Sequence, residues 1–357
     1  MENVINDPRQ ATPEWLTGVL RRSVLLNRGE VIRVENRLTK RLPLSVVSRL
    51  AVVYSDDAPA FAPSRLFLKI SGKDLAQVTL AEPYSREVEF YRTISGAMHD
   101  PPFIRCYGAA YSHASGNGYV LLDDLSDTHF QPEAPLPPAP EHCEAAVECL
   151  AQLHAFWWEH PRLGNDVGRL FDESDLRNFI GDVEKNVAGF VDFLQDDLPV
   201  ERRKIYERLI SSAGKVWGRL TQARGLTVTH GDAHWWNLLY PRESSGERVR
   251  LFDWHLWHVD VGARDLAFMI ALGWYPERRA ALERRLVRRY HESLLAHGVG
   301  NYTWSDCWND YRWAAIRNLN IPVIFWSQGR SASLWRDNLE RAMLAYQDLE
   351  CAELLDD

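Results

Sequence analysis

Hydrophobic and polar positions follow different periods in the two halves of the chain. Up to about residue 125, apolar residues come in short or alternating runs, as in 46–53 and 65–70, a pattern typical of β-strands. Beyond a proline-rich stretch at 131–140, they recur every three or four positions, as in 146–157 and 205–220, which indicates helices with one buried face. The pattern predicts an α+β protein.

This change of period also predicts a division into two lobes. We expect a small β-rich N-terminal lobe at 1–125 and a larger, mainly helical C-terminal lobe at 126–357, with the proline-rich stretch too stiff to be helical. Within the first lobe, the apolar runs predict strands at 31–34 and 46–53, joined by a loop at 38–45. The turn residues Gly116-Asn117-Gly118 predict a hairpin between two further strands.

Composition narrows the class of protein. The chain has 357 residues and a formal net charge of −8, which argues against a nucleic-acid-binding role. Its five cysteines are scattered without C-x-x-C spacing, so neither a disulfide framework nor a zinc site is indicated. No basic segment precedes an apolar run at the N-terminus, and no window approaches eighteen apolar residues, so we expect a cytoplasmic protein without a membrane partner. The sequence leaves the oligomeric state open.

The stretch with the clearest chemistry is 229–239, followed by 251–254. It supplies a carboxylate at Asp232, an amide at Asn237 and a second carboxylate at Asp253, between apolar runs that predict short strands. A loop aspartate can accept a hydrogen bond from an attacking hydroxyl, while the oxygens of Asn237 and Asp253 are hard ligands suited to Mg²⁺. The set fits phosphoryl transfer, although loop aspartates are more often turn or capping residues.

The ordered motifs resemble those of the aminoglycoside phosphotransferase and choline kinase-like superfamily. They are His230-Gly231-Asp232 with Asn237, then Phe252-Asp253-Trp254, then Asp265-Leu266-Ala267. The resemblance implies a bilobal protein-kinase-like fold. It also implies that Asp232 is the catalytic base, that Asn237 and Asp253 bind magnesium, and that Asp265 anchors the loop.

The resemblance also implies a nucleotide site for ATP or GTP in the first lobe. Lys69, in the middle of the strand at 65–70, would contact the α- and β-phosphates, and Glu87 on the following helix would brace it, with Glu89 as the competing partner. Asp123 and Leu125 belong to the stretch that resembles the lobe-connecting hinge. There, backbone groups would hold the purine, and the side chains of Asp123 and Asp124 are candidates for capping instead.

Two features depart from this pattern or leave it open. The connection at 38–45 would cover the phosphates but contains no glycine, so Lys40, Arg41 and Ser45 are the candidate donors, unless their charges are simply solvated. The late aromatic residues either line an acceptor pocket or pack in the core; they are Trp304, Trp308, Trp313, Phe325, Trp326 and Trp335.

Three functions are compatible with these residues. The first is a magnesium-dependent kinase for a hydroxylated small molecule, such as an antibiotic or other natural product. The second is a metabolic sugar, choline or nucleoside kinase that uses the same residues. The third is a catalytically silent nucleotide-binding module, which is disfavoured because Lys69, Asp232, Asn237 and Asp253 are all present.

Overall fold

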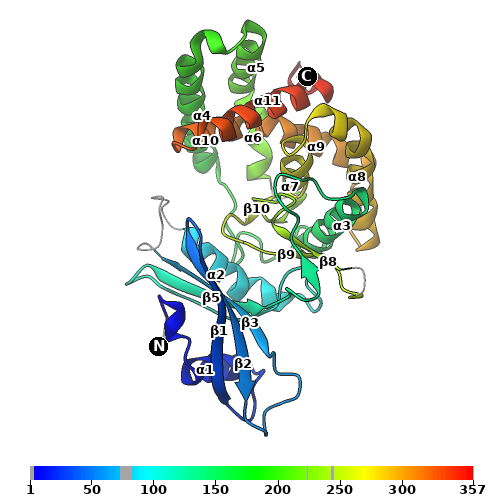
Figure 1. The fold of residues 1–357 in the computed structure, drawn as a ribbon. Coiled ribbons are helices and arrows are strands. Elements are labelled where there is room, and N and C mark those ends of the chain that lie inside the picture. Colours follow the sequence, from blue (N-terminus) through cyan, green and yellow to red (C-terminus); the bar gives the residue numbers. More distant parts are fainter. Residues whose placement is uncertain (1–3, 73–82, 223, 243–244, 357) are drawn as a thin grey trace. The chain divides into compact units, whose positions relative to one another are not determined.

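The structure, a computed structural model, describes residues 4–72, 83–222, 224–242 and 245–356. The chain forms two compact units (Figure 1). The first consists of Met1–Gln131 and Leu239–Trp257, and the second of Pro132–Leu238 and His258–Asp357. The first unit therefore extends past residue 125 to the start of the proline-rich stretch, and it also contains a segment from far along the chain.

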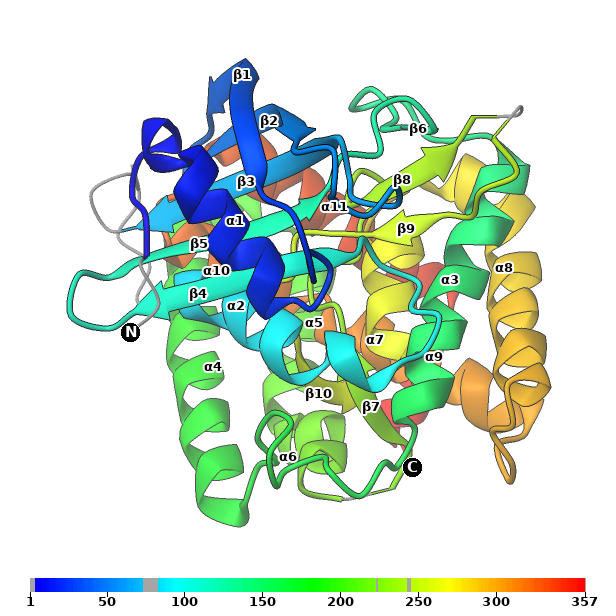
Figure 2. The same ribbon diagram turned by 90° about the horizontal axis from the view of Figure 1, so that it is seen from below.

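The first unit is built on a five-stranded antiparallel sheet in the order β1-β2-β3-β5-β4. Its strands are β1 (Val31–Arg41), β2 (Ser45–Tyr54), β3 (Arg65–Gly72), β4 (Cys106–Ser112) and β5 (Asn117–Asp123). Two helices belong to this unit, α1 (Pro13–Arg22) and α2 (Pro83–Thr93), together with the short 3-10 turns Pro8–Gln10 and Ser95–Ala97. Figure 2 shows α1, in dark blue, lying across the strands.

The two faces of β3 point toward different surroundings. Leu66, Leu68 and Ile70 are buried in the same hydrophobic cluster as Leu16 and Leu20 of α1. Because side chains alternate along a strand, Lys69 points to the opposite face of the sheet. The apolar core thus occupies one face and leaves the other to a charged side chain.

The loop predicted at 38–45 was too long, whereas the hairpin predicted from Gly116-Asn117-Gly118 is confirmed by the antiparallel pairing of β4 with β5, with its turn at 113–116. The strand expected at 31–34 continues to Arg41, which pairs with Val46, so only residues 42–44 form the turn. The sequence pattern missed this extension because β1 is an edge strand whose polar side chains from Glu35 onward are mostly exposed. In the second hairpin, Gly116 takes a positive φ of 69°, but Asn117 already belongs to β5.

A small three-stranded sheet joins the end of the first segment to the returning one. Its order is β6-β8-β9, with β6 at His129–Phe130, β8 at Leu238–Pro241 and β9 at Arg250–Leu251. The paired strands predicted on either side of residues 241–246 are therefore present. The pairing of β6 with β8 explains why 239–257 belongs to the first unit.

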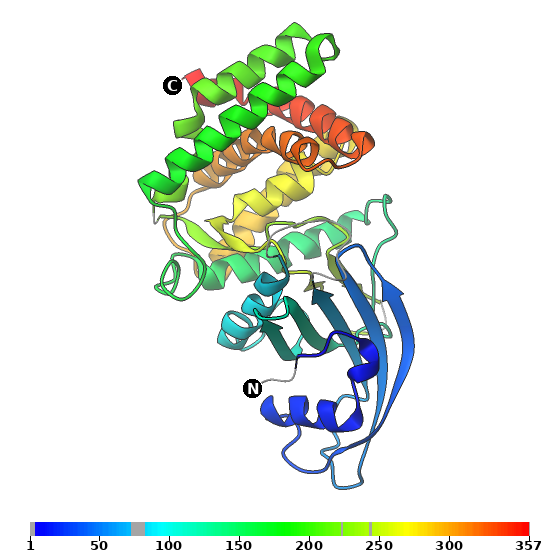
Figure 3. The same ribbon diagram turned by 90° about the vertical axis from the view of Figure 1, so that its left-hand side faces the viewer.

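The second unit is mainly helical, as predicted. Its longer helices are α3 (Pro140–Trp157), α4 (Glu173–Leu194), α5 (Val200–Ser211), α8 (Pro276–Ala296), α9 (Trp304–Arg317), α10 (Asn320–Ser327) and α11 (Ala332–Asp348). The short ones are α6 (Ala213–Trp217), α7 (Ala263–Leu266) and α12 (Ala352–Asp356), with 3-10 turns at Gln195–Asp197 and Gly218–Thr221 and a π-helical turn at Ala267–Ala271. Figure 3 shows α10 beside α4, where Trp326 contacts Phe190.

Two short strands form the centre of the second unit. They are β7 (Leu226–Thr229) and β10 (His258–Val261), which pair antiparallel with Thr229 opposite His258. The loop that carries the predicted chemistry leaves the end of β7, where Thr229 lies opposite His258, whereas α7 follows the other end of the pair, where Val261 lies opposite Leu226. Across the described ranges, no helix is both long and apolar enough to cross a membrane.

Candidate active site

Lys69 of β3 forms ion pairs with two carboxylates. Its Nζ lies 2.7 Å from Oε2 of Glu87 on α2 and 2.6 Å from Oδ1 of Asp253. The predicted pairing of Lys69 with Glu87 is confirmed, whereas Glu89 is exposed. The structure further adds Asp253 as a second partner, so three predicted residues meet at one ammonium group.

Burial and charge act in opposite directions on this cluster. Burial by itself would lower the pKa of Lys69, but the carboxylates of Asp253 and Glu87 outweigh it and raise the pKa above its usual value. Burial would likewise raise the pKa of Asp253, but Lys69 and a hydrogen bond from His255 hold it well below its usual range. Lys69 and Asp253 are therefore charged at neutral pH.

The segment that carries Asp253 is fixed to α2. Trp254 stacks on Phe90 of α2, with ring centroids 3.7 Å apart and planes 6° from parallel. Nε1 of Trp257 donates a hydrogen bond of 2.7 Å to the backbone oxygen of Arg86. Between these contacts and β9, Asp253 has a φ of 69°, which is uncommon for a residue other than glycine. Glu87 and Asp253 thus reach Lys69 from two segments that are packed together.

A cavity of about 420 Å³ in the first unit contains the charged cluster. Its walls include five of the residues predicted for the nucleotide and metal sites: Lys69, Glu87, Asp123, Leu125 and Asp253. This volume is within the usual range for small-molecule sites.

The two hinge aspartates have different surroundings. Burial raises the pKa of Asp123, although a hydrogen bond with Tyr107 and the nearby Arg105 partly oppose this. Asp124 caps the following turn, because its Oδ1 accepts a hydrogen bond of 3.1 Å from the backbone nitrogen of Ser126. Of the two aspartates predicted as capping residues, Asp124 therefore caps a turn through its side chain.

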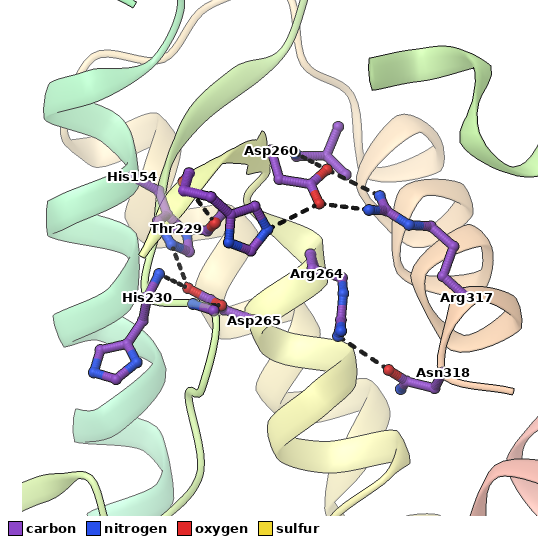
Figure 4. A network of polar contacts seen from close by, with 11 residues as sticks. His154, Thr229, His230, Asp260, Arg264, Asp265, Arg317 and Asn318 are labelled. Atoms are coloured by element: carbon purple, nitrogen blue, oxygen red, sulfur yellow. Dashed lines mark hydrogen bonds and ion pairs between the residues drawn. The ribbon is translucent and has the colours of Figure 1, made fainter. Parts of the chain in front are cut away.

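In the second unit, Asp265 holds the backbone of the loop that follows β7. Its carboxylate accepts hydrogen bonds from the backbone nitrogens of His230, at 2.6 Å, and Gly231, at 3.0 Å (Figure 4). Gly231 has a φ of 80°, a conformation that favours glycine. The predicted anchoring contact of Asp265 with the loop is present.

His154 of α3 completes this anchor. Its Nε2 lies 3.2 Å from Oδ2 of Asp265, and its Nδ1 lies 2.8 Å from the hydroxyl of Tyr290. Burial would raise the pKa of Asp265, but these contacts with His154 and His230 lower it. His154 is fully buried, and both of its ring nitrogens contact polar side chains.

Asp232 and Asn237 contact each other across the loop. Nδ2 of Asn237 donates to the backbone oxygen of Asp232 at 3.0 Å and to its Oδ2 at 3.1 Å. Because the amide nitrogen is used in this way, Oδ1 of Asn237 remains the acceptor that a hard cation requires. At Asp253, Lys69 and His255 both contact Oδ1 and leave Oδ2 for such a cation. The donor sets fit Mg²⁺.

These residues are distributed over both units. Lys69, Glu87 and Asp253 belong to the first unit, whereas Asp232 and Asn237 belong to the second. The binding of one cation by both Asn237 and Asp253 stays a prediction.

Several polar residues that contact the predicted ones within each unit were not predicted from the sequence. In the first unit, His255 donates from Nδ1 to Oδ1 of Asp253 over 3.1 Å. In the second, Arg317 pairs with the buried Asp260 through two contacts of 2.9 and 2.5 Å (Figure 4). Arg264, which directly precedes Asp265, was also not singled out. The partners of Arg317 and Arg264 are distant in the sequence, so no local signal marks them, whereas His255 lies only two residues from Asp253. For Arg264, the position next to the Asp265 motif was the available hint.

Comparisons with solved structures show the protein-kinase-like fold that the sequence predicted. A Ralstonia eutropha protein assigned as an aminoglycoside phosphotransferase aligns over 95% of this chain and 98% of its own, with 15% identity and a TM-score of 0.57. Choline kinase from Cryptosporidium parvum aligns over 96% of both chains, with 14% identity and a TM-score of 0.55. An amicoumacin kinase in complex with AMP-PNP, Ca²⁺ and Ami covers 95% of this chain and 92% of its own, with 12% identity and a TM-score of 0.51.

Sequence comparison gives the family. No curated protein matches the chain by sequence. A sequence profile of the ecdysteroid kinase-like family matches residues 44–298, which include β3 with Lys69, the loop with Asp232, and Asp265. The chain therefore belongs to the ecdysteroid kinase-like family.

Proposed function

We propose that the protein is a phosphotransferase that moves the γ-phosphoryl group of ATP or GTP to a hydroxyl group of a small molecule. The observation that carries this proposal is the pairing of Lys69 with Glu87 and Asp253 inside a cavity that also contains Asp123 and Leu125. Burial of an ammonium group with two carboxylates is energetically costly, and the binding of nucleotide phosphates would explain why this cluster is present.

In this proposal, the residues of the nucleotide and metal sites have separate roles. Lys69 binds the α- and β-phosphates, and Glu87 holds the ammonium in position. Asp253 and Asn237 would hold Mg²⁺, which when bound neutralises charge on the phosphates. Backbone groups of the stretch from Asp123 to Leu125 bind the purine.

The second unit supplies the group that handles the acceptor. Asp232 accepts a hydrogen bond from the acceptor hydroxyl and orients it. The bond between the γ-phosphorus and the β,γ-bridging oxygen breaks, and a bond from the acceptor oxygen to the γ-phosphorus forms. The hydroxyl proton passes to Asp232 late in the reaction and then to solvent. Asn237 helps to orient Asp232 through its contacts of 3.0 and 3.1 Å.

The acceptor is proposed as a class. Membership of a kinase-like family and the protein-kinase-like fold support a hydroxylated small molecule as the acceptor, and we propose an antibiotic or another natural product. A metabolic choline, sugar or nucleoside acceptor is the alternative, and the fold shared with choline kinase is the observation that favours it. A catalytically silent module is less favoured, because the charged cluster and the loop contacts are intact.

The test is a screen with the full-length protein. ATP or GTP with Mg²⁺ is incubated with hydroxylated antibiotics, choline, sugars and nucleosides, and the nucleoside diphosphate and the phosphate ester are detected by mass spectrometry. Nucleotide binding is measured in parallel for the wild type and Lys69→Ala. Binding that requires Lys69, with ester formation from one acceptor class, supports the proposal. If neither nucleotide binds and Lys69→Ala behaves as wild type, the proposal fails.

A further inference from the structure

Two arginines in the second unit lie in one polar network but have different partners. Arg317 is neutralised by the bidentate contact with Asp260, which is 1% exposed. Arg264 donates from Nη1 to Oδ1 of Asn318 at 3.1 Å and lies over the ring of Phe268 (Figure 4). In the described part of the chain, no carboxylate lies within ion-pairing distance of Arg264.

The neutral partner of Arg264 is itself fixed. Nδ2 of Asn318 donates to the backbone oxygen of Ala267 at 2.9 Å, so its Oδ1 is the atom left to face Arg264. A single amide oxygen satisfies one of the five N–H donors of a guanidinium group. No other hydrogen bond joins this guanidinium group to a residue in the described part of the chain.

The surroundings make this charge costly. Burial and the neighbouring Arg317 lower the pKa of Arg264 to about 10, while Asp260, Asp265 and Asp232 partly oppose the shift. A half-buried cation without an adjacent anion gains little favourable electrostatic energy on folding, so packing alone does not account for it. Arg264 still carries a positive charge at neutral pH, because a pKa of about 10 is well above that pH.

Arg264 lies near Asp232, the residue proposed to bind the acceptor hydroxyl. It directly precedes Asp265, which holds the backbone of the loop with Asp232, and its guanidinium is close enough to Asp232 for their charges to interact. The residue is partly exposed, in contrast to the fully buried His154 and His230 of the same network. A ligand held near Asp232 can therefore reach it.

We propose that Arg264 binds an anionic oxygen group, a carboxylate or a phosphoryl group, beside Asp232. The planar fork of a guanidinium matches both groups through two parallel hydrogen bonds. Two sources are possible within this chemistry: an anionic substituent of the acceptor, or the phosphoryl group in transfer. The role of this anion site in a reaction rests on the proposed function, but the binding of an anion at Arg264 can be measured without turnover.

The first experiment measures anion binding and stability in the full-length protein. Inorganic phosphate is titrated at constant ionic strength into the wild type, Arg264→Gln, Arg264→Lys and the control Arg284→Gln, with and without MgADP. Arg284 is an exposed arginine of the same unit that lies over Trp304 and Trp308. We expect Arg264→Gln to weaken phosphate binding roughly ten- to a hundredfold, Arg264→Lys to retain part of it, and Arg284→Gln to leave it unchanged.

Thermal unfolding separates this role from a structural one. Arg264→Gln should melt at or above the wild-type temperature, because it removes a charge that lacks an acidic partner. Arg317→Gln should melt lower, because it leaves Asp260 buried without its cation. A structural role for Arg264 would instead make both substitutions destabilising, and that result would count against the proposal.

The second experiment distinguishes the two sources of the anion. Slow hydrolysis of ATP uses water as the acceptor, so a tenfold or larger loss of this rate in Arg264→Gln assigns the contact to the phosphoryl group in transfer. An unchanged hydrolysis rate with weaker phosphate binding assigns it to the acceptor. In that case, hydroxylated acids should be preferred over their methyl esters by the wild type and not by the variant.

The proposal and the proposed function fail in different ways. If the wild type and Arg264→Gln bind phosphate equally and hydrolyse ATP equally, Arg264 is not an anion-binding residue, whatever the nucleotide data show. If phosphate binding depends on Arg264 but no nucleotide binds, the anion site stands and the phosphotransferase proposal fails.

Discussion

The charged cluster of the first unit and the loop of the second hold their functional carboxylates in different ways. In the first, Asp253 is held by an opposite charge, at 2.6 Å from Lys69. In the second, the carboxylate of Asp232 contacts the neutral amide of Asn237 at 3.1 Å and His234 at 3.7 Å. Ion pairing keeps Asp253 an anion, which suits the charged ligands proposed for it, whereas the neutral amide beside Asp232 suits its proposed role toward the acceptor. Substitutions in the two regions should therefore have distinguishable effects.

The largest effect is expected at Asp253. Asp253→Ala should abolish metal-dependent turnover, because it removes a proposed Mg²⁺ ligand. The fold should survive, since Lys69 keeps its ion pair of 2.7 Å with Glu87. Phosphate-ester formation at increasing Mg²⁺ and the melting temperature are the measurements. Equal activity in this variant would remove Asp253 from the mechanism.

Asp232 should show the second-largest effect, in rate but not in nucleotide binding. Asp232→Asn should retain nucleotide affinity, because the residues proposed to bind the nucleotide belong to the other unit, and should lose on the order of 10²–10⁴ in kcat. The rival base is His230, which is fully buried and whose Nδ1 accepts from the backbone nitrogen of Asp232 at 3.3 Å. If His230→Ala eliminated turnover and Asp232→Asn stayed near the wild type, the assignment would be reversed.

Glu87 should show a smaller effect, in nucleotide affinity. Glu87→Gln removes one of the two charges beside Lys69, while Asp253 keeps the ammonium paired, so we expect nucleotide binding to weaken by roughly tenfold. Titration calorimetry with MgATP measures this. Glu89→Gln, on the exposed face of the same helix, is the matched control and should bind as the wild type does.

The smallest effect concerns stability in the second unit, away from the loop. Burial raises the pKa of Glu283 to about 7, although a hydrogen bond from Tyr311 and the nearby Arg279 oppose the shift and Asp348 adds to it. Because the folded-state pKa exceeds the unfolded one, this group stabilises the fold fully below pH 4.5, and the contribution is lost as pH rises through about 7.

The matched variant isolates that contribution. Glu283→Gln should flatten the decline in the free energy of unfolding between pH 4.5 and 7.5, by on the order of 1–3 kcal/mol relative to the wild type. Denaturant unfolding at several pH values measures it, and turnover should be unaffected. Parallel curves for the two proteins would show that Glu283 does not titrate in this range.

The sequence by itself determined the features that depend on short spacing. Alternation along 65–70 put Lys69 on the same face as Phe67, where a buried ammonium needs a partner, and the structure provides Glu87, the partner that the resemblance implied. The motif around Asp265 predicted its contact with the loop, which the backbone hydrogen bonds of His230 and Gly231 confirm. Strand alternation fixes which side chains share a face, and the resemblance of the ordered motifs to a known family supplied the partners.

Only the tertiary structure decided the features that depend on distant partners. It extended β1 to Arg41 as an exposed edge strand, returned residues 239–257 to the first unit through the pairing of β6 with β8, and gave Lys69 its second carboxylate. It also gave the two arginines different partners, because Arg317 forms an ion pair with Asp260, whereas Arg264 is hydrogen-bonded to the side-chain amide of Asn318. The two arginines are equivalent in the sequence, because the sequence states a side chain's charge but not which distant group packing will bring to it.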